Sequence, residues 1–278
     1  MARFEPRTEV AIARTRADVA RFHKGLSRSG TAGASSAVVS ARVPEADLFV
    51  ITPDDPQRAD SGPETMVVVD LDGVVVSNIP GSESAPARGV GVHADLYRFG
   101  TAIGGLAHVA SPYASAFALR SEPLPCLTIT IAEEFGGDVP VIPHDIDDAG
   151  LARRLHAELA DGHRRAVLVA RHGAYTAGLD LRDALRAAVA LEEAARIVQL
   201  GRDGLAPGVR VDPLPADLVD ALHARRRRDD ARRVDRGAPL GAFPTSRTGS
   251  PGSSGGAGSW TTPPPNGSVT DNDVRNSQ

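Results

Sequence analysis

The amino-acid sequence predicts an α/β domain in which helices cover a β-sheet. The first half of the chain contains apolar segments joined by turn-rich residues, the pattern of hairpins. In the second half, apolar strand-like segments alternate with helical patterns. One of these segments, "RRAVLVAR" at 164–171, is too apolar for a strand with one face in solvent. Together these features predict a sheet that is covered by helices.

The first elements follow from local patterns. Apolar residues at helical spacing predict a helix over 8–26. The segments "SAVVSARV" (36–43) and "DLFVIT" (47–52) predict two strands with a turn at "PEAD" between them. "MVVVDLDGVVV" (66–76) predicts two short strands around an Asp-Gly turn. "VHADLYRFG" (92–100) is helical.

The second half continues with strands and helices in alternation. "IGGLAHV" (103–109) predicts a strand, and "SPYASAFAL" (111–119) a helix with serine at its cap and proline at its first position. "CLTITI" (126–131) predicts another strand, as does 164–171. Helical periodicity predicts the remaining helices at about 148–160, 180–200 and 215–228.

The composition changes sharply near residue 235, and the chain is predicted to divide into a folded domain, 1–230, and a tail, 231–278. Gly, Ser, Pro and Thr dominate the tail, and its apolar residues are too sparse to offset chain entropy, so it is predicted to be disordered. The run "ARRRRDDARR" (224–233), just before this change in composition, fits the solvated end of a helix or a nucleic-acid patch. Acidic residues interrupt the basic ones, which favours the solvated helix end.

Composition also limits the function. The formal charge of -4 provides no basic field for nucleic acid. Lys24 is the only lysine, which leaves one candidate for Schiff-base chemistry. Cys126 is the only cysteine, so an intrachain disulfide and a cysteine-rich zinc site are excluded. No secretory signal or membrane span is visible in the sequence, and a cytoplasmic protein is expected.

Two histidines each follow an apolar strand. His108 comes after "IGGLA", and His172 comes after "AVLVAR" and before Gly173. Imidazoles at adjacent strand ends would converge on one divalent metal ion. The alternative is that each is a hydrogen-bonded packing residue, and the residues alone leave both open.

Seven segments in order carry a resemblance to a known family: "DLFVITP", "MVVVDLDGVVV", "HADLYR", "AHVASPYASAFAL", "EEFGGDVPVIP", "AVLVARHGAYTAG" and "LEEAARI". From about residue 8 to residue 202 the chain resembles the class II aldolase/adducin family, which includes fuculose-phosphate aldolases and ribulose-phosphate 4-epimerases. The resemblance implies a three-layer α/β/α domain with a mainly antiparallel central sheet. It also implies a homotetramer with active sites between subunits, in which three histidines hold Zn²⁺ or a similar ion that stabilises an enediolate.

The match at the metal site is incomplete. By the resemblance, His108 takes the place of the first metal ligand and His172 that of the third, in "ARHG" rather than "RNHG". The second ligand position is Ala110, which has no donor atom. The acidic position, nineteen residues before His108, is Gly89. One ligand and the catalytic acid are therefore absent together.

The phosphate site of the family is also altered. Two serines that bind substrate phosphate in the aldolases are Ala87 and Arg88 here. Of the other half of that site, Ser35 and Ser36 remain and are expected to bind substrate. Arg88 is either a contact for an anionic substrate or a solvated surface residue.

Other side chains are candidates for the missing groups. His93 lies one helical turn after Gly89 and either replaces the acid, reaches the metal, or only matches a histidine common in the family. Glu133 and Glu134 are alternative metal donors. Tyr113, near the start of its helix, either faces the site as a catalytic residue or is packed.

Three functions follow. The first is a metal-dependent aldehyde-lyase or epimerase acting on a small sugar-derived or polyhydroxy carbonyl compound, with His108 and His172 on the metal. The second is a catalytically silent scaffold or binding member of the family, without a ligand at Ala110 and an acid at Gly89. The third is metal-independent chemistry in the same pocket. No nucleic-acid or membrane partner is expected, and the chain is expected to form a homotetramer.

Overall fold

A computed structural model describes most of the predicted domain and the start of the predicted tail. The described residues are 4–28, 31, 37–54, 62–76, 84–100, 102–144, 147–159, 163–204, 206 and 211–235. They belong to one compact unit, Met1–Thr245. Seven strands within the described residues form one sheet, in the order β3-β2-β1-β4-β7-β6-β5. Every neighbouring pair is antiparallel except β5 and β6, which confirms the mainly antiparallel sheet.

The elements have the following bounds. The strands are β1 (Ala37–Arg42), β2 (Leu48–Ile51), β3 (Val67–Asp70), β4 (Gly105–Val109), β5 (Val141–Ile142), β6 (Ala166–Val169) and β7 (Gly173–Gly178). The helices are α1 (Pro6–Arg28), α2 (Val90–Phe99), α3 (Pro112–Leu119), α4 (Ile129–Phe135), α5 (Asp148–Leu159), α6 (Leu181–Asp203), α7 (Ala216–Asp235) and the short 3₁₀ helix η1 (Pro63–Thr65). None of the described helices is long and apolar enough to cross a membrane.

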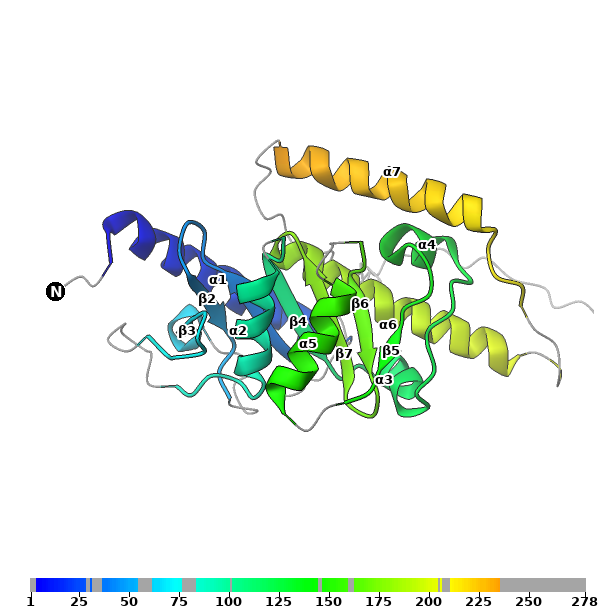
Figure 1. Cartoon of the computed structure of the whole chain (residues 1–278), viewed down its shortest axis with the longest axis horizontal. Coiled ribbons are helices and arrows are strands. Elements are labelled where there is room, and N and C mark those ends of the chain that lie inside the picture. Colours follow the sequence, from blue (N-terminus) through cyan, green and yellow to red (C-terminus); the bar gives the residue numbers. More distant parts are fainter. Residues whose placement is uncertain are drawn as a thin grey trace, which may run out of the picture. The chain divides into compact units, whose positions relative to one another are not determined.

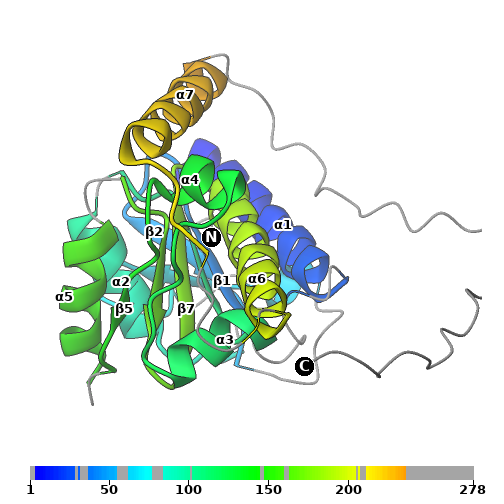
Figure 2. The ribbon, with the colours of Figure 1, turned by 90° about the vertical axis from the view of Figure 1, so that its right-hand side faces the viewer.

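The helices cover both faces of the sheet, which confirms the predicted α/β architecture. Figures 1 and 2 show α2 and α5 on one face, and α1, α3 and α6 on the other. Each face has its own buried apolar cluster, because side chains alternate between the two sides of a strand. In β4, for example, Leu106 packs beneath α2 and α5, whereas Ala107 belongs to the cluster on the opposite face.

The prediction of a strand at 126–131 is wrong, because the second half of this segment belongs to a helix. Thr128 accepts a hydrogen bond from the Ile131 N–H through its side chain, and the helix α4 begins at the next residue. A threonine in extended conformation that satisfies a free N–H is a typical helix cap. The β-branched residues that suggested a strand therefore lie at the start of a helix.

Two further strands differ from the sequence prediction. In 66–76 only the first half is a strand, β3, and the second half forms a single bridge between Val75 and Val69. Asp70 explains this, because its Oδ1 accepts the N–H groups of Asp72 and Val74 and fixes the turn. The strand β7 was not predicted, since "GAYTAG" is rich in small residues.

Helix α7 continues to Asp235, beyond the predicted domain boundary at residue 230. The sequence suggested that the charged run in α7 is solvated. Asp230 within this run is only 4% exposed, so the run is partly buried. Asp230 belongs to what we call the α7 ion network, whose members are Glu134, Arg165, Arg186, Arg226 and Asp230. The rest of the predicted tail, from residue 236, lies outside the described residues.

Candidate functional site

Side chains of the neighbouring strands β4 and β7 form the floor of the site. His108 of β4 and Tyr175 of β7 are directly opposite each other in this antiparallel pair. Their rings stack with centroids 4.6 Å apart and planes 18° apart. Tyr175 is 2% exposed, and the Nε2 atom of His108 is buried without a hydrogen-bond partner. An unpaired buried nitrogen is costly, which makes it a candidate contact for a ligand.

A tight turn brings the second predicted histidine to this floor. His172 lies between β6 and β7, flanked by Arg171 at φ 60° and Gly173 at φ 133°. A Cβ at Gly173 would lie 2.6 Å from the carbonyl oxygen of Val109, so glycine is required where the turn meets β4. The His172 ring then stacks on His108 with centroids 4.5 Å apart. The structure thus brings together the two histidines that the sequence singled out.

Two exposed side chains form the rim. His144, just after β5, has its ring centroid 4.6 Å from that of His172. Asp148, the first residue of α5, approaches the first turn of α2, where a Cβ at Gly91 would lie 2.8 Å from Asp148 Oδ2. We call His108, His144, Asp148, His172 and Tyr175 the histidine site.

The start of α2 forms a side wall. Gly89 caps this helix at φ 79°, in the left-handed region, and provides no side-chain cap. A Cβ at Gly89 would lie 3.7 Å from Tyr175 Oη. The position that the resemblance assigns to an acidic residue is therefore next to the hydroxyl of Tyr175.

His93 lies behind the floor. It is 1% exposed, and its Nδ1 is 2.7 Å from the hydroxyl oxygen of Ser40, which is in turn 2.8 Å from the hydroxyl of Tyr97. The His93 ring centroid is 6.1 Å from that of Tyr175. Like His108, it has an Nε2 atom that is buried without a partner.

Loss of contact with water keeps the imidazoles of His93 and His108 neutral. Burial lowers the pKa of His93 to about 4. Burial, reinforced by neighbouring histidines, lowers the pKa of His108 to about 3, although a hydrogen bond to the main chain of His172 acts in the opposite direction. A neutral His108 that donates to a main-chain group keeps a free lone pair on Nε2. This nitrogen is therefore an acceptor for a ligand hydroxyl or a donor atom for a metal.

Asp148 influences two groups of the site. Burial lowers the pKa of His172, with His144 acting in the same direction and Asp148 in the opposite one. Burial raises the pKa of Tyr175, and the negative charge of Asp148 adds to the effect. Tyr175 is therefore protonated at neutral pH and is a hydrogen-bond donor.

The side chains as arranged do not fit a metal ion of the kind the resemblance implies. The planes of His108 and His172 are only 10° apart in a stacked arrangement, and the lone pair of an imidazole lies in its ring plane. One ion cannot lie in both planes at about 2.0–2.1 Å from both nitrogens. Among the described residues no group of three His, Cys, Asp or Glu side chains is placed to hold a metal.

The other predicted residues lie elsewhere. Ser35 and Ser36 are outside the described residues. The Arg88 side chain is 94% exposed and its Nε is 3.7 Å from a carboxylate oxygen of Asp54. Tyr113 packs against the cluster on the opposite face of the sheet, with Arg196 over its ring at 5.9 Å.

The two glutamates considered as metal donors are engaged at α7. Glu134 belongs to the α7 ion network, and Glu133 pairs with Arg225. Neither is part of the histidine site.

Three residues of the site were missed in the sequence. His144 follows the apolar segment "VPVIP", the same signal that identified His108 and His172. Tyr175 and Asp148 had no local signal, because their positions depend on the register of β7 and on the packing of α5 against α2.

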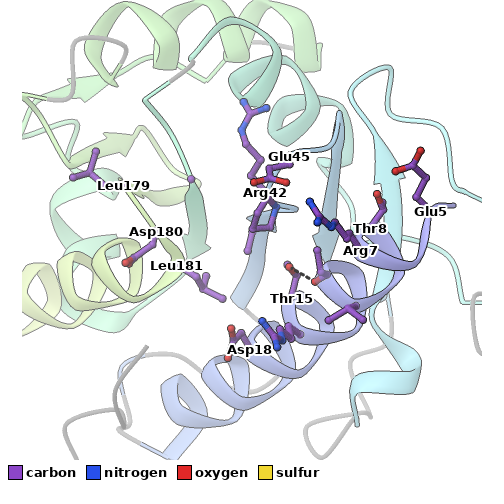
Figure 3. Close-up of a pocket in the computed structure, with 16 residues that line it drawn as sticks. Glu5, Arg7, Thr8, Thr15, Asp18, Arg42, Glu45, Leu179, Asp180 and Leu181 are labelled. Carbon is purple, nitrogen blue, oxygen red and sulfur yellow. Dashed lines mark hydrogen bonds between the residues drawn. The ribbon is translucent and has the colours of Figure 1, made fainter. Parts of the chain in front are cut away.

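A cavity of about 710 Å³ lies away from the histidines. Asp18 of α1 and Asp180, at the start of α6, both line it (Figure 3). Gly104, just before β4, also lines it, whereas His108 is near the other end of β4. Burial raises the pKa of Asp18, opposed by Arg21 and reinforced by Asp180. Geometry and unpaired buried nitrogens favour the histidine site over this cavity as the centre of chemistry.

The chain is similar in sequence to a family of known proteins. The family model described as Class II Aldolase and Adducin N-terminal domain matches residues 17–199. The L-ribulose-5-phosphate 4-epimerase UlaF of Salmonella paratyphi A is 30% identical over 198 residues, which cover 68% of this chain and 84% of that protein.

Solved structures agree. An L-fuculose 1-phosphate aldolase is 25% identical, with a TM-score of 0.67 over 77% of this chain and 96% of that chain. The L-fuculose-1-phosphate aldolase of Thermus thermophilus is 26% identical, with a TM-score of 0.57 over 69% of this chain and 100% of that chain. An aldolase II superfamily protein from Pseudomonas syringae, 19% identical with a TM-score of 0.67, shares the fold.

Proposed function

This chain belongs to the class II aldolase and adducin family, and we propose that it is an aldehyde-lyase or epimerase acting on a small sugar-derived or polyhydroxy carbonyl compound. The observation that carries the proposal is the unpartnered Nε2 atom of His108, buried at the floor of the histidine site. A substrate hydroxyl that donates to this nitrogen would remove the cost of leaving it unpaired. His172, His144 and Asp148 surround the same space with further polar groups.

The substrate we propose carries no phosphate group. At the two positions where the family resemblance places phosphate-binding serines, Ala87 is 4% exposed and Arg88 points to solvent. An alanine side chain has no donor for a phosphate oxygen, and an exposed arginine is screened by salt. The relatives named above act on sugar phosphates by their names, so substrate class is where this chain differs from them.

A panel of compounds tests this function. Purified protein is incubated with L-fuculose 1-phosphate, L-ribulose 5-phosphate and their unphosphorylated counterparts, and products are followed by NMR. We expect cleavage or epimerisation, with kcat/KM at least about tenfold higher for an unphosphorylated compound, or about 1.4 kcal/mol. Faster turnover of the phosphates would contradict the proposed substrate class.

The family resemblance implies a divalent ion such as zinc, but no step proposed for this site depends on one. His108 and His172 offer two imidazoles in stacked orientation, and Ala110 offers none. In protein purified without a His tag and incubated with zinc, manganese, cobalt or nickel, we expect well under one ion per chain. A stoichiometric ion that is lost in His172→Ala would show that the rings rearrange around a metal, and would restore the metal-dependent function.

A second candidate function rests on the same substitutions. Ala110 and Gly89 together remove two groups that the resemblance assigns to catalysis, as expected for a silent scaffold or binding member. If no compound of the panel gives a product, the silent scaffold or binding function is favoured over the enzyme. This holds whether or not the compounds bind.

We also propose that the chain assembles as a homotetramer. His144 and Asp148 are exposed at the rim in the single chain, so a neighbouring subunit has access to the site. Light scattering during size-exclusion chromatography tests the proposal, and a monomer at micromolar concentration would contradict it.

A further inference from the structure

The space beside Gly89 contains a hydroxyl group. Gly89 is in the left-handed region at φ 79°, where a non-glycine residue would be strained. A Cβ built there would lie 3.7 Å from Tyr175 Oη. The phenol of Tyr175 on β7 therefore places a proton next to the position where the acidic side chain is missing.

A carboxylate reaches the same wall from another helix. Asp148 of α5 lies against the first turn of α2, and its Oδ2 is so close that a Cβ at Gly91 would be 2.8 Å away. The first N–H groups of α2 have no side-chain cap at Gly89, and such a helix start favours a negative charge. Glycine at position 91 therefore leaves room for the Asp148 carboxylate, whereas at Gly89 a Cβ would be in ordinary contact with Tyr175 Oη.

Two buried nitrogens point independently to a ligand here. His93 is 1% exposed and is held through Nδ1 by Ser40, yet its Nε2 has no partner. His108, stacked on Tyr175, also has an unpartnered Nε2. Buried polar atoms are nearly always paired, so two unpaired nitrogens around one tyrosine ring indicate a place for a polar ligand.

We propose that Tyr175 and Asp148 are the proton-transfer pair of this site, and that together they replace the acidic side chain absent at Gly89. The proposal rests on the proposed lyase or epimerase function and names the residues that perform it. Both side chains border the start of α2, next to the floor formed by His108.

The cleavage step balances with these two groups alone. The Asp148 carboxylate accepts the proton of the substrate hydroxyl whose carbon becomes the aldehyde. The carbon–carbon bond breaks and its electron pair passes into the enediolate. Tyr175 Oη donates its proton to the enediolate carbon, and Asp148 then returns its proton to the Tyr175 oxygen through solvent water, to which the exposed carboxylate has access. His108 Nε2 accepts a hydrogen bond from another substrate hydroxyl and orients it.

The electrostatics agree with this division of roles. Burial and the charge of Asp148 both raise the pKa of Tyr175, so the phenol enters the reaction protonated. Asp148 is exposed, which gives its carboxylate access to substrate and to water.

The reverse half-reaction tests the pair without the aldehyde. A ketone probe bound at the site would lose a carbon-bound proton to Tyr175 as Asp148 takes the phenolic proton through water, and deuterium would return from D₂O. The probes are dihydroxyacetone and dihydroxyacetone phosphate, and the exchange is followed by ¹H NMR. We expect Tyr175→Phe and Asp148→Asn each to slow exchange at least about 100-fold, with KM changed by no more than about threefold.

The matched control is Asp95→Asn. Asp95 lies on α2, and its carboxylate pairs with Arg98 at 3.9 Å. We expect it to exchange within about twofold of wild type. Asp148→Glu is expected to recover at least about tenfold over Asp148→Asn, since it restores the carboxylate. Thermal unfolding of each variant identifies any that fails to fold.

The outcomes separate the two proposals. If wild type exchanges neither probe, the proposed function fails. If wild type exchanges and Tyr175→Phe does so at the same rate, the proton-transfer pair is wrong and the enzyme function stands. A loss in Asp148→Asn that appears only in KM would reduce Asp148 to substrate binding and would also overturn the pair.

Discussion

Two polar clusters of this domain, the α7 ion network and the histidine site, differ in how their members are paired. In the α7 ion network, Arg165 Nη2 is 2.6 Å from Asp230, and every charge has an ion-pair partner. In the histidine site the rings stack, and His108 keeps an unpartnered Nε2, as does His93 behind it. Ion pairs among buried charges fix the position of an element, here α7, even though Nε and Nη2 of Arg226 make ion pairs without hydrogen bonds. A ring nitrogen without an ion-pair or hydrogen-bond partner is instead available to a ligand. The variants below test this difference.

The largest effect is expected in the paired cluster. Arg165→Met leaves Glu134 and Asp230 buried with fewer partners, and breaking a buried pair costs about 3–5 kcal/mol. Denaturant unfolding measures the loss, and hydrogen exchange in α7 should rise. Arg225→Met is the control, because the exposed pair of Arg225 with Glu133 is worth about 0–1 kcal/mol. Equal losses in the two variants would mean that burial of the network contributes nothing to its strength.

The stability contribution of His93, whose Nε2 has no partner behind the histidine site, should instead depend on pH. Burial lowers the pKa of His93 to about 4, whereas an unfolded histidine titrates near its usual 6.5. Below pH 6.5 the unfolded chain binds a proton that folded His93 does not bind, so stability falls as pH drops toward 4. At pH 5 the loss is about 2 kcal/mol.

The variant His93→Leu isolates this contribution. It removes the titrating group, while Ser40 keeps its hydrogen bond with Tyr97. Stability measured by denaturant at pH 7 and pH 5 should fall by about 2 kcal/mol less in the variant than in wild type. The same pH dependence in both proteins would show that His93 is protonated in the folded state.

A smaller effect is expected at a carboxylate that is paired only with main chain. Glu192 of α6 accepts the N–H groups of Tyr113 and Ala114 at the start of α3. Glu192→Gln removes the charge and keeps one acceptor oxygen, so we expect a loss of about 1–2 kcal/mol. The adjacent exposed Glu193→Gln should change stability by less than about 0.5 kcal/mol. A loss at Glu193 as large as that at Glu192 would contradict the cap.

Site residues that follow a local sequence pattern could be predicted from the sequence, whereas those placed by strand pairing could not. His108 and His172 were found because each follows an apolar strand, which is a local pattern. Tyr175 was missed because its place beside His108 depends on the pairing of two strands far apart in sequence. The helix α4 was mistaken for a strand because one side-chain hydrogen bond, from Thr128, outweighed the β-propensity of its neighbours.

The smallest effect is expected in the turn that holds His172. Arg171 is exposed and adopts φ 60°, where most residues are strained and asparagine is better tolerated. Its N–H still bonds to the carbonyl of Ala118, which keeps the turn in place. Arg171→Asn should therefore stabilise the protein by about 0.5–1 kcal/mol, measured as a higher Tm. A gain in stability with unchanged deuterium exchange would show that the strain at Arg171 is separate from the chemistry. A gain accompanied by slower exchange would show instead that the strained turn positions His172 for the reaction.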